Sequence, residues 1–176
     1  MSENKQAHAT KKTGMAMLFI SFALGLGVLT LFFDSALSSR QNPNRNPEST
    51  LADDGSISVT LRRNPQGHYL VSGFINDARA NFLLDTGATD VVMSEALAEQ
   101  AGLERGYPTR AMTANGEVTV YSAVINSVQI GNITLNNVSS SINPAMQGST
   151  VLLGMSALRH IEFTQRGDSL TLRYIP

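Results

Sequence analysis

The first strong pattern along the chain is an apolar run near its N-terminus. From Gly14 to Phe33 no residue carries a charge. A helix of about 20 residues, rising about 1.5 Å per residue, crosses a hydrocarbon core about 30 Å thick. Three lysines precede the run and an aspartate follows it. The positive-inside rule therefore predicts a cytoplasmic tail over residues 1–13, a transmembrane signal anchor over residues 14–33, and export of the remainder.

A cleaved signal peptide is the alternative interpretation of the same run. The apolar region of such a peptide usually spans only about 7 to 15 residues. The segment Ala36–Ser38 is a possible but poor small-residue cleavage site. The length of the run favours the anchor.

A change of composition follows the apolar run. Residues 34–55 are rich in Ser, Asn, Pro, Arg and Gln and contain few apolar side chains. Such a segment buries too little apolar surface to offset the entropy lost on ordering. We expect a flexible linker over residues 34–55 and a folded domain over residues 56–176.

Period-2 patterns begin with this domain. Apolar and polar residues alternate over Ile57–Arg62, and a second apolar run, His68–Asn76, follows a turn that contains Pro65 and Gly67. We expect these two strands to pair with each other. A third run, Ala80–Asp85, holds three consecutive apolar residues, which predicts a strand buried on both faces.

Further turn signals divide the rest of the domain into short elements. Ser94 is placed to cap a short helix that Gly102 ends. Hairpin turns are predicted at Asn115–Gly116, Gly131–Asn132 and Arg166–Asp168. Many short strands with one or two short helices are typical of an all-β barrel or sandwich.

Composition narrows the functional classes. The 176 residues carry a net charge of −1, no Trp and four Tyr, which argues against nucleic-acid binding. The chain has no cysteine, so it has no disulfide, no Cys-based zinc site and no cysteine nucleophile. Neither His68 nor His160 has a second histidine at metal-ligand spacing, and we expect no metal.

The segment FLLDTGATDVV, residues 82–92, carries an aspartate out of an apolar strand and turns at once. The Gly87 N–H and the Thr86 hydroxyl are placed to hold the Asp85 carboxylate by hydrogen bonds, which suits chemistry. Asp and Gly are also ordinary turn residues, so a plain strand-ending turn has the same composition. A phosphotransferase aspartate needs further acids and a lysine, yet no lysine follows Lys12.

A second apolar strand, Val151–Gly154, also ends in a glycine and is followed by another predicted short helix. The domain resembles the single-domain retropepsin-like aspartic proteases, and most closely their bacterial membrane-anchored members. The likeness runs from about Gly67 to Tyr174. Four segments carry it: LLDTGAT at Leu83–Thr89, AGL at Ala101–Leu103, TANG at Thr113–Gly116 and LLGMSAL at Leu152–Leu158.

The resemblance implies a single-lobe protease barrel behind one transmembrane helix, acting on proteins or peptides without a cofactor. It implies that Asp85 is the catalytic carboxylate and that Thr86 and Gly87 support its loop. It also implies a substrate-covering flap at Thr113, Ala114, Asn115 and Gly116, and a structural strand over Leu152–Gly154. A bacterial member anchored in this way would sit in the inner membrane with its protease domain in the periplasm.

Aspartic peptide hydrolysis needs two carboxylates that share one proton. Each chain holds one Asp-Thr-Gly, and Asp90, Glu95, Asp53 and Asp54 are more simply explained as turn, cap or solvated residues. Asp90 is also a candidate contact to the substrate backbone. We therefore expect a homodimer that contributes one Asp85 from each chain. The alternative is a non-catalytic, membrane-tethered β domain of the same fold that binds peptides or envelope proteins.

Overall fold

The structure is a computed structural model that describes residues 3–113 and 116–176. It forms two compact units, Met1–Ser39 and Arg40–Pro176. The expected turn at Asn115–Gly116 lies partly outside the described residues, because Ala114 and Asn115 are not among them.

The first unit is a single long helix, α1 (Glu3–Gln41). Its segment Met17–Gln41 is long and apolar enough to cross a membrane, and the most apolar window of that segment is not buried. An N-terminal signal sequence passes the same test of length and composition, so the helix is consistent with either an anchor or a signal sequence.

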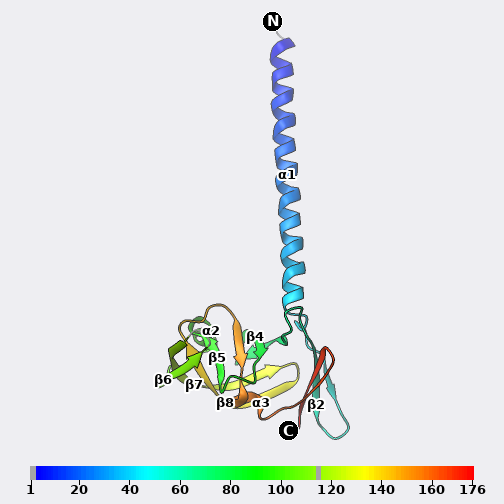
Figure 1. The fold of residues 1–176 in the computed structure, drawn as a ribbon. Helices are drawn as coiled ribbons and strands as arrows, with labels where there is room; N and C mark the ends of the chain where they lie inside the picture. The colour runs from blue at the N-terminus through cyan, green and yellow to red at the C-terminus, as the bar shows by residue number, and fades with distance from the viewer. Residues whose placement is uncertain (1–2, 114–115) are drawn as a thin grey trace. The chain divides into compact units, whose positions relative to one another are not determined.

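The second unit consists mainly of short strands (Figure 1). This confirms the all-β prediction with short helices. The elements that the described residues form are β1 (Ser49–Leu51), β2 (Ile57–Arg62), β3 (Leu70–Ile75), β4 (Ala78–Leu84), β5 (Val91–Ser94), α2 (Glu95–Gln100), β6 (Pro108–Thr113), β7 (Gly116–Ile130), β8 (Ile133–Asn143), β9 (Thr150–Leu153), α3 (Met155–Leu158), β10 (Glu162–Arg166) and β11 (Ser169–Tyr174).

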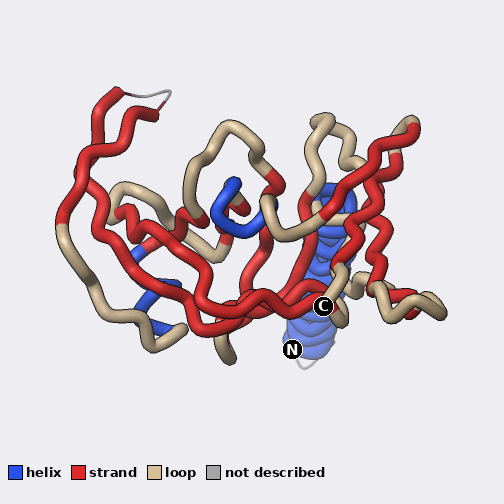
Figure 2. The backbone as a smooth tube through the Cα atoms, turned by 90° about the horizontal axis from the view of Figure 1, so that it is seen from below, coloured by secondary structure: helices blue, strands red, loops and turns tan. Residues whose placement is uncertain are grey.

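Six strands close into a barrel in the order β3-β4-β9-β5-β8-β7, because β7 also pairs with β3. The pairs β4–β9 and β5–β8 are parallel, and the others are antiparallel. Strand β6 pairs only with β7, so these two form a hairpin that extends beyond the ring (Figure 2). Phe82, Ile125, Ile142 and Leu153 are fully buried in the core, and each contributes about 1.5–3 kcal/mol by burial.

Helix α2 follows its sequence signals. The Ser94 hydroxyl accepts a hydrogen bond from the Leu97 N–H at 3.3 Å. Gly102, with φ of +67°, lies just beyond the end of the helix in the left-handed region that favours glycine. The predicted turns at Gly131–Asn132 and Arg166–Asp168 also connect paired strands.

The remaining strands form a separate sheet in the order β1-β2-β11-β10. The expected pairing of the first two predicted strands is wrong, because β2 pairs with β1 and β11 while β3 pairs with β4 and β7. The reason lies in the loop between them. The Asn64 side chain accepts hydrogen bonds from the Gln66 and His68 N–H groups. This closed loop leads the chain from one sheet into the other.

The third predicted strand, β4, is less buried than predicted, because burial on both faces was expected. Phe82 is fully buried, whereas Leu83 and Leu84 are half-buried. Its last residues lie near the groove described below, since Leu152, the partner of Leu83 on β9, lines that groove.

The prediction that residues 34–55 form a flexible linker differs from the structure. Helix α1 continues to Gln41, β1 lies within the interval, and Asn42 and Asn44 are buried. We call residues 42–44 the strap. The polar composition was misleading because asparagine amides replace water with hydrogen bonds to the backbone of the domain. The folded unit therefore begins well before residue 56.

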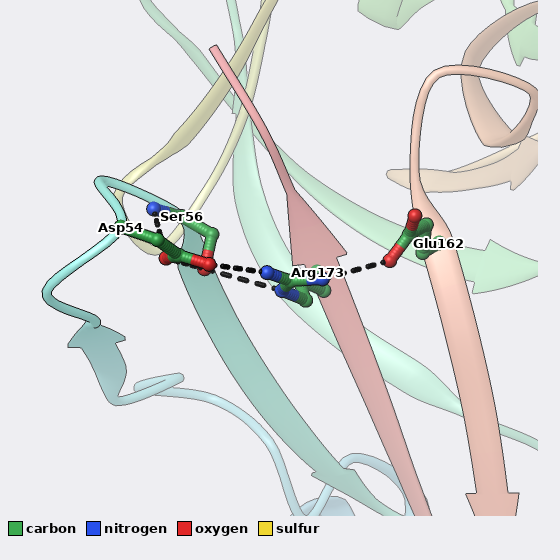
Figure 3. A network of polar contacts seen from close by, with 4 residues as sticks. All are labelled: Asp54, Ser56, Glu162 and Arg173. Atoms are coloured by element: carbon green, nitrogen blue, oxygen red, sulfur yellow. Dashed lines mark hydrogen bonds and ion pairs between the residues drawn. The ribbon is translucent and has the colours of Figure 1, made fainter.

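A network on the second sheet fixes the loop between β1 and β2 (Figure 3). Arg173 donates hydrogen bonds to Asp54 at 2.6 Å, to the Ser56 hydroxyl at 3.1 Å and to Glu162 at 3.2 Å. The Ser56 hydroxyl and N–H also bond to Asp54. Hydrogen bonds from Ser56, assisted by the Arg173 charge, lower the pKa of Asp54 from its ordinary value.

Candidate active site

The barrel positions Asp85 by means of two parallel strands. Leu83 and Leu84 of β4 pair with Leu152 and Leu153 of β9. Asp85 follows directly, and its N–H donates to the Leu153 carbonyl at 3.2 Å. The aspartate therefore stands at the carboxyl end of a strand that is anchored on one side by β9.

The carboxylate is held by its own turn. Its Oδ1 accepts a hydrogen bond from the Gly87 N–H at 2.9 Å, and the Ala88 N–H donates to the Asp85 carbonyl at 3.2 Å. A Cβ on Gly87 would lie 3.2 Å from Oδ1, tighter than an ordinary contact. Thr86 is exposed, and its hydroxyl makes no hydrogen bond within the described residues. Gly87 thus supports the carboxylate within one chain, whereas Thr86 does not.

The rest of the loop is attached to the start of α3. Met155 and Ser156 donate their N–H groups to the carbonyls of Ala88 and Thr89 at 2.9 and 2.8 Å. A Cβ at position 154 would lie 2.6 Å from the Ala88 carbonyl oxygen and 2.2 Å from the Asp90 one. Only glycine permits this approach, which is why the second apolar strand ends in Gly154.

Two serines that sequence reasoning did not single out support the aspartate loop. The Ser156 hydroxyl accepts from the Val91 N–H at 3.0 Å and donates to the Ser139 carbonyl at 2.7 Å. The Ser141 hydroxyl donates to Asp90 Oδ2 at 3.3 Å. Ser141 lies in the SSS run over residues 139–141 and Ser156 in the LLGMSAL segment, and neither pattern by itself indicates a contact with the aspartate loop more than fifty positions away.

A groove of about 710 Å³ opens beside Asp85. The volume falls within the range of about 300–1,000 Å³ that is typical of ligand sites. Its lining includes Asp85 and Asp90 from the loop, residues of the β6–β7 hairpin, and apolar side chains from the barrel. The residues concerned are Asp85, Asp90, Thr109, Ala111, Val120, Met146 and Leu152.

Residues of the β6–β7 hairpin, including Thr113 of the expected flap, line this groove. Thr109 and Ala111 of β6 pair with Val120 and Val118 of β7, so these four side chains share one face. Arg110, which pairs with Thr119 and also lines the groove, forms an exposed ion pair with Glu117 at 3.2 Å.

Of the four expected flap residues, Thr113 and Gly116 stand at the end of the hairpin. The Thr113 hydroxyl donates to the Gly116 carbonyl at 2.8 Å. Ala114 and Asn115 lie outside the described residues.

The described residues contain no group of three or more His, Asp or Glu side chains that could hold a metal ion. Among the residues that line the groove, the carboxylates are Asp85 and Asp90.

The closed barrel, the aspartate loop and the covering hairpin define a retropepsin-like aspartic protease fold. A solved retropepsin-like aspartic protease from Rickettsia conorii matches with a TM-score of 0.59 and 28% identity, covering 73% of this chain and 96% of that one. The chain belongs to the family described as "gag-polyprotein putative aspartyl protease", whose model matches residues 71–160.

Two curated relatives carry no assigned activity. An uncharacterized protein from the cobV 5′ region of a Sinorhizobium species is 30% identical over 68% of this chain and 53% of its own length. Uncharacterized protein RP867 of Rickettsia prowazekii is 29% identical over 66% of this chain and 51% of its own length. The chain thus spans about half the length of these curated relatives.

Proposed function

We propose that the chain is a membrane-anchored aspartic endopeptidase that hydrolyses peptide bonds in proteins as a homodimer. The observation that carries this proposal is the Asp85 carboxylate, held by the Gly87 N–H at 2.9 Å beside a groove of about 710 Å³. Family membership supports a peptidase. Asp85 is the proposed catalytic residue, and Thr86 and Gly87 are its proposed support.

The proposed chemistry needs a pair of carboxylates. One carboxylate takes a proton from the attacking water, while its protonated partner donates a hydrogen bond to the scissile carbonyl. Asp90 already accepts a hydrogen bond from Ser141. A twofold axis beside the exposed Thr86 and Gly87 would instead bring in Asp85 of a second copy. Asp90 and the tip of the hairpin are proposed to contact the substrate backbone.

The proposed location is the bacterial inner membrane, with helix α1 as a single-pass anchor and the barrel in the periplasm. The length and apolar character of Met17–Gln41 support this. Anchoring both copies in one plane raises their effective concentration, which favours a weak dimer.

A peptide-cleavage assay tests the proposal. The full-length chain in detergent micelles is incubated with a proteome-derived peptide library, beside Asp85→Asn as an isosteric control. We expect cleavage by wild type and at least a roughly 100-fold loss in the variant, since this carboxylate supplies acid–base catalysis. Cleavage that persists in Asp85→Asn would refute the assignment. Peptides retained without being cut would favour the non-catalytic peptide-binding domain.

A further inference from the structure

The strap joins the two sheets of the folded unit through Asn44. Its Oδ1 accepts from the Arg62 N–H at 2.7 Å, and its Nδ2 donates to the carbonyls of Arg62 at 2.9 Å and Leu70 at 2.7 Å. Its own carbonyl accepts from the Ser72 N–H at 3.1 Å. Arg62 ends β2 and Leu70 begins β3. One buried side chain therefore holds both sheets at their junction.

Asn42 binds the strand that carries the proposed catalytic residue. Its Nδ2 donates to the Ser72 hydroxyl at 2.9 Å and to Asn81 Oδ1 at 3.2 Å. Its Oδ1 accepts from the Asn44 N–H at 3.0 Å. Asn81 lies on β4, which ends just before Asp85. The strap is thus part of the scaffold of the aspartate loop.

Detaching the strap from the domain costs free energy, because its two asparagines are buried and hydrogen-bonded. Asn42 and Asn44 are only 6% and 7% exposed, and each hydrogen bond that holds them contributes about 0.5–1.5 kcal/mol net. Detachment would break several of these bonds at once. The segment free to act as a tether is therefore reduced from residues 34–55 to residues 34–41.

This shortening limits how far the groove can stand from a bilayer. Residues 34–41 span about 12 Å as a helix and at most about 28 Å when fully extended. A folded unit of about 140 residues has a radius of gyration near 14 Å, hence a diameter of about 37 Å. The groove then lies within about 50 Å of the membrane surface with a helical tether, and within about 65 Å with an extended one.

We propose that the chain acts on peptide segments held close to the membrane surface, such as the juxtamembrane regions of other membrane proteins. This inference rests on the proposed function, both proteolysis and anchoring. A membrane-bound substrate whose scissile bond is fixed beyond about 65 Å is out of reach. A freely diffusing peptide is not restricted in this way, because it can approach the groove at any height.

The test uses full-length chain and single-pass reporter proteins reconstituted in the same vesicles. Each reporter carries one cleavable sequence selected in the peptide screen, raised on a helical (EAAAK) spacer of about 1.5 Å per residue. Spacers of about 20 and about 60 residues place the site near 30 Å and near 90 Å. We expect the near site to be cut at least tenfold faster. Equal rates at the two heights would overturn the inference.

A variant with a longer tether makes the test specific. A Gly/Ser insert of about 60 residues between Ser39 and Arg40 lengthens the tether without entering the strap. We expect it to raise cleavage of the far site at least fivefold. The matched control carries the same insert between Ala9 and Thr10, ahead of the apolar run, and should leave the far-site rate at the wild-type value. An unchanged far-site rate in the Ser39–Arg40 variant would also overturn the inference.

A soluble peptide with the same sequence distinguishes failure of the height limit from failure of the proposed proteolytic function. If wild type cuts it and Asp85→Asn does not, proteolysis stands whatever the reporters show. Equal cutting at both heights then rejects only the height limit. If the soluble peptide is not cut, the proposed function fails and the inference fails with it.

Discussion

Replacement of Gly154 by alanine should both destabilise the fold and disturb the aspartate loop. The backbone at this position has φ of −87° and ψ of −173°, which any residue adopts, so the cost is steric. The new Cβ would lie 2.2 Å from the Asp90 carbonyl oxygen and 2.6 Å from that of Ala88. Both atoms belong to the backbone and cannot rotate away. Because Cβ contacts essentially never fall below 3.0 Å, the loop or helix α3 must move by at least about 0.8 Å.

The expected penalty is about 3 kcal/mol, at the upper end of the range for overpacking. For a unit of this size that corresponds to a fall in Tm of roughly 6–12 °C. Circular dichroism melts of full-length protein in micelles measure it. Gly167→Ala is the control: its φ of +60° costs about 1–2 kcal/mol of strain, with no atom within 4 Å. Well below both melting temperatures, Gly154→Ala should lose peptide cleavage while Gly167→Ala keeps it. A wild-type Tm in Gly154→Ala would refute the steric reasoning.

Three further predictions concern assembly, the strap and pH. Equal mixing of wild type with Asp85→Ala, after subunit exchange, should leave about a quarter of the cleavage rate by random pairing, whereas a rate of one half would indicate independent monomers. Asn44→Ala should lower the free energy of unfolding in denaturant by about 2–4 kcal/mol, because it leaves backbone groups at the sheet junction unpaired, and the exposed Asn46→Ala should change it by less than about 0.5 kcal/mol. Because the pKa of Asp54 is lowered in the folded state, its stabilisation is complete above the ordinary value of 3.8 and is lost as pH falls through the lowered value. Asp54→Asn should therefore melt below wild type at neutral pH and together with it in strong acid, and an equal gap at both pH values would contradict this.

The sequence predicted those features that depend on neighbouring residues. The turn after Asp85, the Ser94 cap and the glycine turns are each specified within a few positions. The pairing of β2 with β11 was missed because it joins positions more than 100 residues apart, and alternation alone does not choose a partner.

The strap was missed for a different reason. The composition of NPNRNPEST, residues 42–50, is that of a disordered segment, because it offers almost no apolar surface. Asn42 and Asn44 are nonetheless buried, since their amides bond to groups on β2, β3 and β4. Ser156 is similar, because its role depends on Val91 and Ser139 meeting at one point. Buried polar contacts of this kind follow from tertiary structure and leave little local signal.

The way the loop is supported bears on the proposed dimer. Gly87, Leu153 and helix α3 bond to the loop within one chain, so the loop does not need a second copy in order to hold its shape. A partner would then supply an acid and cover the exposed Thr86, rather than complete the fold. An interface that is not needed to hold the loop together can be weak, because the contacts within one chain already fix the position of Asp85. If the proposed dimer is weak, anchoring both copies in one membrane raises their local concentration. A higher local concentration increases the fraction of copies that are paired, and so the number of complete active sites.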